Sequence, residues 1–293
     1  TQDDYRVKKF SVNYYHEKDC LEQAIKKLCI EVADAVEDGV RCCILSDSDI
    51  QPDKLPIQML MAVGAVHHYL IKLGLRCNAN IIASTASARD SHQIATLIGC
   101  GASAVYPFLS YHVLSDMVDL GEILCDTGTA FKNYRQGMNK GLLKILSKMG
   151  ISNVSSYRGS GLFEVIGFSD QVNEICFPAN CSLIKGDCFE DLHQNIMLII
   201  HSGVDNSLVA KGLHKFKHDG EDHAYNPDVV MNLQNSLKVG SYIGFKDFSS
   251  HINNRKPLAI RDFFKLNSNR KPLDIEEVEP IEDILKNQVV IDI

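Results

Sequence analysis

The sequence predicts an α/β fold: a parallel sheet with flanking helices, partly like a (β/α) barrel, followed by a mainly helical C-terminal extension. The first observation is that short apolar runs, such as RCCIL at 41–45 and NIIAS at 80–84, alternate with amphipathic segments of helical periodicity. The second is that the connections between these segments are short. Together they imply parallel strands joined by right-handed crossovers.

Length and composition limit the class of protein. With 293 residues and 45% hydrophobic composition, the chain can bury one large core or two small ones. The net charge of −7 argues against a nucleic-acid-binding or membrane-surface protein, because these usually carry a basic excess or patch. No apolar run is long enough to cross a bilayer. There is no initial Met and no apolar signal region, so we expect an intracellular fragment whose 10 cysteines are reduced.

The first half contains three expected strands and four expected helices. Residues 20–38 form an amphipathic helix that Gly39 ends, and its apolar face consists of Leu21, Ala24, Ile25, Leu28, Val32, Ala35 and Val36. Pro56 opens a helix that extends to residue 73 and is apolar almost all round, so we expect it to be buried. After the strands at 41–45 and 80–84, the remaining expected elements are a strand at 102–108 and helices at 91–98 and 111–120.

A long helix is expected at 129–150, capped by Thr129 and closed by Gly150 in a left-handed conformation. Its apolar stripe consists of Phe131, Tyr134, Met138, Leu142, Ile145 and Met149. Gly137 and Gly141 lie on one face and suggest that another backbone packs closely there. Off the stripe, we expect a solvated face, or a surface for a neighbouring domain, formed by Lys132, Lys140, Lys144 and Lys148.

Beyond this helix the pattern becomes weaker. Residues 151–157 indicate a strand, and the RGSG sequence at 158–161 indicates a tight turn into a short helix that ends at Gly167. Further helices are expected at 189–202, 242–252 and 258–264, and after Pro227, where Asn226 caps the start. We therefore expect a tighter domain over 1–168 and a looser continuation and linker over 169–293.

Two loops are candidates for binding. The SDSD sequence at 46–49 follows a buried strand, at the edge of a parallel sheet where ligands usually bind, although a polar turn without function is the favoured interpretation. The RGSG turn could hold a phosphate at a helix N-terminus, but it lacks the spacing of a P-loop or a G-x-G-x-x-G motif. We interpret it as a structural turn.

Metal binding is considered for three groups of residues. Cys176, Cys181 and Cys188 could hold a metal or cluster in isolation, but incidental thiols are favoured. The adjacent His67 and His68 point about 100° apart on a helix, so a buried hydrogen-bonding role is favoured over chelation. In HDGEDH at 218–223 the spacing differs from H-E-x-x-H, and the Gly indicates a turn. No catalytic, cofactor-binding or metal-binding residue is assigned.

Several long stretches resemble the central domain of the glutamate synthase large chain. KGLLKILSKMGISNVSSYRGSGLFEVIG at 140–167 is similar to the family's KGLLK-x-MSKMGIST-x-QSYRGAQIFEA. GASAVYPFLS at 101–110 parallels GADA-x-NPYLA, HAYNPDVVMNLQ parallels HA-x-NP-x-x-x-x-x-LQ, and EEVEP at 276–280 parallels DEVEP. Ser48 stands where the family often has Arg, ASTAS at 83–87 replaces a more acidic segment, and Gln93 replaces one His of a pair.

The resemblance runs from about residue 20 to residue 286 and implies a function. In the family, glutamine is hydrolysed in a glutaminase domain, and the ammonia moves through a tunnel to 2-oxoglutarate in an FMN domain. The central domain connects these two partners and helps shape the tunnel. FMN and the iron–sulfur cluster of the parent enzyme are expected outside this chain, which we expect to be inert alone, in the cytoplasm or a plastid. The alternative is a stand-alone α/β binding or regulatory protein derived from that domain.

Overall fold

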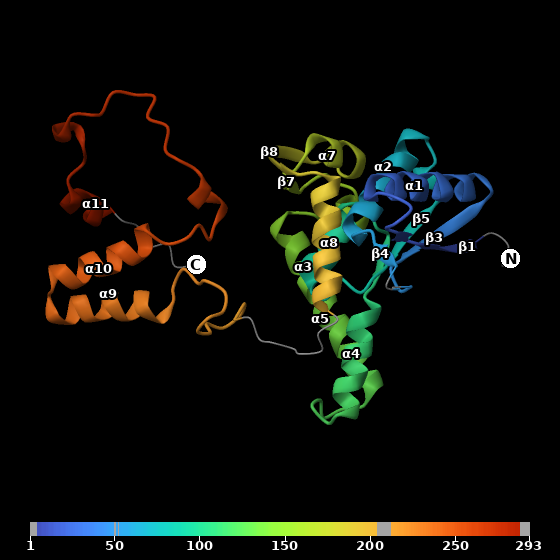
Figure 1. The fold of residues 1–293 in the computed structure, drawn as a ribbon, viewed down its shortest axis with the longest axis horizontal. Coiled ribbons are helices and arrows are strands. Elements are labelled where there is room, and N and C mark those ends of the chain that lie inside the picture. Colours follow the sequence, from blue (N-terminus) through green and yellow to red (C-terminus); the bar gives the residue numbers. More distant parts are fainter. Residues whose placement is uncertain (1–4, 50, 52, 204–211, 288–293) are drawn as a thin grey trace. The chain divides into compact units, whose positions relative to one another are not determined.

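A four-stranded parallel sheet organises the first part of the chain (Figure 1). The computed structural model describes residues 5–49, 51, 53–203 and 212–287. The sheet has the order β1-β3-β5-β6, with β1 at Arg6–Ser11, β3 at Val40–Ser46, β5 at Asn80–Ser84 and β6 at Ala104–Tyr106. The predicted mixed α/β class with a parallel sheet is therefore confirmed.

Strand β1 was not predicted, because its RVKKFS sequence is charged and most of its side chains are exposed. Lysines are typical of edge strands, where they discourage pairing with other chains. Immediately after it, β2 at Asn13–Tyr15 pairs antiparallel with β4 at Lys54–Pro56. Pro56 therefore belongs to a strand, and its predicted place at the start of a helix is wrong.

Helices α1 (Leu21–Glu37) and α2 (Met59–Lys72) pack on one another and contribute much of the main core. All seven residues of the predicted face of the first helix are buried. Gly39 follows α1 with a φ of 93°, as expected of the residue that ends a helix. Nine of the residues of α2 are buried, so the prediction of a buried helix is confirmed although the helix begins three residues later.

The middle of the chain contains α3 (Ser91–Gly99), α4 (Phe108–Asp119) and α5 (Thr127–Lys148). Asp126, not Thr129, caps α5, because its carboxylate accepts a hydrogen bond from the Thr129 N–H at 2.9 Å. A Cβ on Gly141 would lie 2.4 Å from the side chain of Ser91, which confirms a close approach, although to a side chain. Nothing lies within 4 Å of such an atom on Gly137, so the predicted contact there is wrong. The four lysines predicted to be solvated are all exposed.

Two elements after α5 are the reverse of the expectation. Residues 151–157, expected as a strand, contain the short helix α6 (Val154–Tyr157), which Asn153 caps through the Ser156 N–H. The expected helix that ends at Gly167 is instead strand β7 (Glu164–Phe168). Tyr157 is fully buried with Ala95, Ile98 and Leu146, so its apolar character serves packing between helices and not a sheet.

A second small sheet and two helices complete the first compact unit. Strand β7 pairs in parallel with β8 (Cys181–Asp187), and α7 (Asp170–Cys176) lies between them in the chain. Helix α8 (Phe189–Gly203), predicted at 189–202, contacts α1, β4 and β8. The Tyr14 hydroxyl lies 2.8 Å from His193 Nδ1 and joins this helix to β2. Residues 169–206 thus belong to the same unit as the central sheet.

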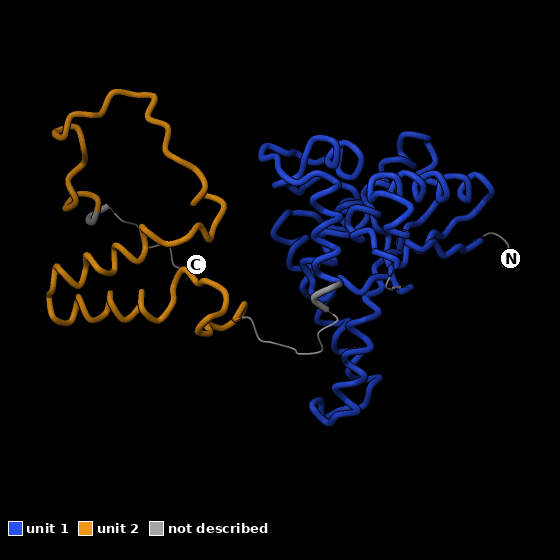
Figure 2. Tube along the Cα trace, in the orientation of Figure 1, with its two compact units in different colours: residues 1–206 blue, residues 207–293 orange. Residues whose placement is uncertain are grey.

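The second compact unit comprises residues 207–293 (Figure 2). Helices α9 (Pro227–Val239) and α10 (Tyr242–Asn253) pack on one another, and Asn226 caps α9 as predicted. They are followed by η3 (Ile260–Phe263), η4 (Ile275–Glu277) and α11 (Ile281–Asn287). Many large apolar side chains of this unit are exposed, including Leu237, Val239 and Ile243. None of the helices in the described part of the chain is long and apolar enough to span a bilayer.

Candidate functional site

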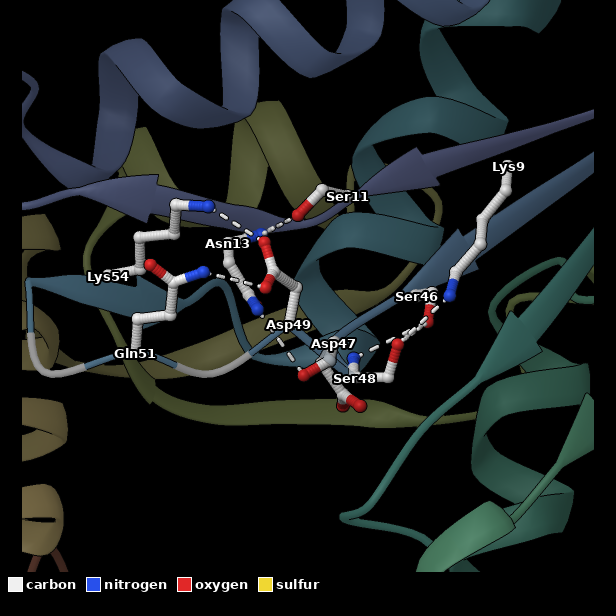
Figure 3. A network of polar contacts seen from close by, with 9 residues as sticks. All are labelled: Lys9, Ser11, Asn13, Ser46, Asp47, Ser48, Asp49, Gln51 and Lys54. Carbon is white, nitrogen blue, oxygen red and sulfur yellow. Dashed lines mark hydrogen bonds and ion pairs between the residues drawn. The ribbon is translucent and has the colours of Figure 1, made fainter.

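The carboxyl edge of the central sheet brings together the loops that follow β3 and β5. Asp47 leaves the end of β3 and is only 5% exposed. Its carboxylate accepts hydrogen bonds from the Thr85 hydroxyl and, at 3.0 and 3.3 Å, from the Ala86 N–H. Its carbonyl oxygen accepts a hydrogen bond from the Asn13 side chain at 3.3 Å (Figure 3). Asp47 therefore joins three segments that are distant in the sequence.

Burial raises the pKa of Asp47 above its ordinary value, although the bonds from Thr85 and Ala86 act in the opposite direction. The two loops thus hold a carboxylate in a partly desolvated position. Both of its oxygens are already occupied by groups of the protein. This geometry supports the favoured interpretation of the SDSD sequence as a structural turn.

The residues that follow Asp47 make two further sets of polar contacts (Figure 3). Asp49 pairs with Lys54 at 2.7 Å and accepts a hydrogen bond from Gln51 at 2.9 Å. Ser48 accepts a hydrogen bond from Lys9 at 3.0 Å. The Lys54 side chain is 15% exposed, whereas that of Asp49 is 52% exposed. These contacts link Asp49 to β4 and Ser48 to β1.

A cavity of about 530 Å³ lies beside Asp47. Its walls come from the segment before α2, from α3 and from α8, and they are mainly apolar, with Ile57, Leu97 and Ile196 among them. Asp47, His92 and Gln93 add polar groups to the lining. The Gln93 side chain is engaged in the capping box of α3, where its oxygen accepts a hydrogen bond from the Arg89 N–H at 2.8 Å.

Cavities of this size and character bind small molecules through apolar contact and a few polar groups. Among the polar lining residues of this cavity, Ser87 lies 2.9 Å from the Thr85 hydroxyl that donates to Asp47. Sequence reasoning found the Asp47 loop but missed the cavity, because its wall on α8 is 140 residues or more further along the chain. No local signal in the sequence indicates that wall.

His67 is buried, as predicted, and participates in hydrogen bonding. Its Nδ1 accepts a hydrogen bond from Arg76 Nε at 2.8 Å, and Arg76 Nη2 also donates to the Gly101 carbonyl at 2.8 Å. Gly101 and Gly159 both pack against the imidazole, where a Cβ would lie within 2.7 Å of ring atoms. Burial, and then the neighbouring Arg76, lower the pKa of His67 to about 3. The imidazole is therefore a neutral structural group.

The remaining residues considered for binding lie apart or are already engaged. In the RGSG turn, Arg158 donates to the Ser103 hydroxyl at 3.3 Å, and Gly159 and Gly161 have φ of 66° and 64°, as a tight turn requires. His223 Nε2 lies 2.6 Å from the Gly212 carbonyl, and Gly220 donates to the Lys217 carbonyl in the predicted turn.

The cysteine group does not fit an iron–sulfur cluster. Cys176 is buried in α7, where burial raises the pKa of its thiol well above the usual range, whereas Cys181 is exposed on β8. A cluster ligand must be a thiolate, which this burial disfavours. Within the described ranges, no group of three or more His, Cys, Asp or Glu side chains is arranged to hold a metal ion. At the RGSG turn, the Gly159 and Ser160 N–H groups already donate to the Ile98 and Tyr157 carbonyls, each at 3.3 Å.

Comparison with known proteins identifies the family. Residues 1–169 match the family model described as the glutamate synthase central domain. The chain is 37% identical over 282 residues to the ferredoxin-dependent glutamate synthase of Pyropia yezoensis. This alignment covers 90% of this chain and 18% of the Pyropia protein. It is 34% identical over 274 residues to the NADPH glutamate synthase large chain of Azospirillum brasilense, with 92% and 18% covered. The Bacillus subtilis NADPH large chain is 32% identical over 270 residues, with 91% and 18% covered.

The chain thus spans less than a fifth of the length of these relatives. Among solved structures, a mutant flavocytochrome b2 matches 50% of this chain with a TM-score of 0.36 and 12% identity, which is too low to support an inference. The family model covers more than half of the chain, and the relatives cover nearly all of it. The chain therefore belongs to the glutamate synthase central domain family.

Proposed function

We propose that this chain is the central connecting domain of a glutamate synthase large chain. The observation that carries the proposal is the family match over residues 1–169, extended by relatives that align with about 90% of the chain. Because the chain spans only 18% of those relatives, the activity of the whole enzyme belongs to a longer protein. In this proposal the chain links the glutaminase and FMN domains and is inert alone.

The proposed parent reaction makes glutamate from glutamine and 2-oxoglutarate. Glutamine is hydrolysed in one domain, ammonia crosses to the second domain, and the imine formed with 2-oxoglutarate is reduced there. FMN and an iron–sulfur cluster supply the reducing chemistry in the parent enzyme, and none of the residues of this chain is assigned to them. The central domain holds the two sites in register and contributes part of the wall of the ammonia tunnel. The proposed location is the cytoplasm or a plastid.

The exposed apolar surface of residues 207–293 supports a connecting role. Val239, Tyr242 and Ile243 are 79%, 70% and 75% exposed and lie close together in the chain, at the junction of α9 and α10. Large apolar side chains that are exposed close together are typical of interaction sites. Relatives have more than four-fifths of their length outside the aligned region, which is ample chain to cover this surface.

A domain exchange tests the proposal. The matching segment of the Bacillus subtilis large chain is replaced by this chain, and the chimera is purified. Its NADPH-dependent synthesis of glutamate is then assayed. We expect glutamate to form from glutamine and 2-oxoglutarate without added ammonia. The critical quantity is the amount of 2-oxoglutarate consumed per glutamine hydrolysed, with the unaltered enzyme as the control.

Two outcomes contradict the proposal. A chimera that binds FMN and hydrolyses glutamine, but releases the ammonia to solvent, excludes a contribution of this chain to the tunnel. Absorbance peaks of flavin, or turnover of glutamine and 2-oxoglutarate, in the purified chain alone exclude the inert domain. The observation on the side of the alternative, a stand-alone binding protein, is the 530 Å³ cavity. Saturable binding of a small molecule in this cavity of the isolated chain would support that alternative.

A further inference from the structure

A second cavity, of about 370 Å³, lies where β6 ends and α4 and α5 come together. It shares none of its lining with the cavity beside Asp47, and its lining residues are Tyr106, Tyr111, Gly128, Phe131, Lys132 and Arg135. The last residue of β6 is Tyr106, so this cavity also lies at the carboxyl edge of the parallel sheet. Ligands of α/β proteins usually bind at this edge.

Aromatic side chains form one wall. Tyr106 and Tyr111 are stacked with their ring centroids 5.7 Å apart and their planes 24° from parallel. Tyr111 also packs edge-on against Phe131 at 4.9 Å and against Tyr134 at 5.5 Å. Tyr134 is fixed in turn by donating a hydrogen bond to the Arg89 carbonyl at 3.0 Å. These contacts hold the rings in place, while Tyr106 keeps 50% of its surface exposed and accessible to another planar ring.

Two cations complete the lining. Lys132 and Arg135 extend from α5, and neither makes an ion pair or a side-chain hydrogen bond within the part of the chain that the structure describes. Gly128 lies in the first turn of the same helix, where the macrodipole is positive. At the N-terminus of the same helix, the Asp126 carboxylate accepts hydrogen bonds from the Thr129 N–H and hydroxyl. The residues that line this cavity therefore carry two positive charges and no carboxylate, in a chain whose net charge is −7.

A ligand that uses both features has a planar ring to stack on Tyr106 and an anionic group to pair with the two cations. Nucleobases stack on aromatic side chains, and phosphates form strong charge-assisted hydrogen bonds with Lys and Arg. We propose that this cavity binds a nucleoside phosphate.

Binding is tested on the full chain by calorimetric titration with three probes: AMP, adenosine and inorganic phosphate. AMP presents both the ring and the anion, so we expect it to bind saturably and at least tenfold more tightly than either of the other two probes. Added salt should weaken AMP binding, because two cations contribute. Failure of AMP to saturate overturns the proposal. Phosphate binding as tight as AMP binding also overturns it, since the aromatic wall then contributes nothing.

Three variants locate the site. Tyr106→Asn removes the stacking surface and should weaken AMP binding about tenfold, because stacking on an aromatic side chain contributes roughly that much. Lys132→Gln and Arg135→Gln should each weaken AMP binding and reduce its dependence on salt. Lys140→Gln, an exposed lysine elsewhere on α5, is the matched control and should leave binding unchanged. Circular dichroism verifies that each variant is folded. AMP binding that survives in all three folded variants places the ligand elsewhere and contradicts the proposal.

Discussion

At the scale of single residues, Asp47 determines how the carboxyl edge of the sheet is built. One carboxylate serves both the Thr85 hydroxyl and the Ala86 N–H, and so fixes the loop after β5 against the loop after β3. A buried carboxylate is costly unless its oxygens are paired. In this loop that condition is met, so the residue acts as a structural link beside the larger cavity.

Replacing Asp47 with Ala should lower the free energy of unfolding by about 1–3 kcal/mol, because the buried Thr85 hydroxyl and the half-buried Ala86 N–H lose their acceptor. Urea denaturation measures the change. Asp49→Ala is the matched control, since its carboxylate lies on the solvent side of the same loop, and it should have little effect. Equal losses from the two substitutions would contradict the structural role of Asp47.

His67 makes the fold sensitive to acid. Its pKa is about 3 in the folded chain and about 6.5 when unfolded, so the unfolded state takes up a proton first as the pH falls. The stability that the neutral imidazole contributes is complete above pH 6.5 and is lost between about pH 6.5 and pH 3. At pH 5 the loss is about 2 kcal/mol by this linkage.

The measurement is the free energy of unfolding in urea at pH 7, 6 and 5. The charged groups near His67 are Arg76, His68 and Arg158, and all three act against its protonation. His67→Gln should flatten the pH dependence, whereas His92→Gln, which alters an exposed histidine, should leave it unchanged. A pH dependence that persists in His67→Gln would assign the effect to another group.

Sequence reasoning located the SDSD loop but could not rank its two aspartates. The distinction between Asp47 and Asp49 arises from Thr85, which is 38 residues away in the chain but adjacent in the sheet edge. The burial of His67 was more predictable, because this residue lies within a helix that is apolar almost all round. Its partner Arg76 is nine residues away, beyond the next turn of the chain.

At the scale of elements, two glycines within helices distinguish the effect of close packing on stability from the effect of helix propensity. A Cβ on Gly64 of α2 would lie 2.2 Å from the backbone oxygen of Cys176, at the end of α7. On Gly137 of α5 it would meet nothing within 4 Å. The two glycines occupy helix interiors and differ only in their surroundings, so they form a matched pair.

Gly64→Ala should destabilise the chain by about 1–3 kcal/mol, because backbone must move to admit the methyl group. Gly137→Ala should stabilise it by about 0.5–1 kcal/mol through helix propensity alone. Thermal and urea denaturation of the two variants provide the test. Destabilisation by Gly137→Ala would mean that a neighbour approaches α5 at this point, and a neutral Gly64→Ala would mean that α2 and α7 can separate.

The elements that could be predicted are those whose own sequence carries the periodicity. Helix α1 and strand β5 lie within a residue or two of their expected bounds because burial on one face, or on both, is visible in the sequence. The reversal over residues 151–168 has a different origin. Tyr157 is buried in a contact between helices and not in a sheet. The strand that follows contains Glu164 and Gly167, two residue types that are uncommon in strands.

At the scale of the whole molecule, the two compact units differ in how they are stabilised. Every residue of the main buried core lies between Phe10 and Ile196. In the second unit, by contrast, Leu266, Leu273 and Ile275 are 104%, 72% and 83% exposed. A unit with so little buried apolar surface gains little free energy from its own folding.

The last prediction follows from this difference. A chain of residues 1–206 should unfold cooperatively at the same midpoint as the full chain, because it retains the whole main core. The helices of residues 207–293 should melt earlier and without a sharp transition, since few of their apolar side chains are buried. Circular dichroism on heating compares the two chains. A midpoint several degrees lower for residues 1–206 would show that the second unit stabilises the first directly, and a sharp independent transition of residues 207–293 would show that this unit has a sufficient core of its own.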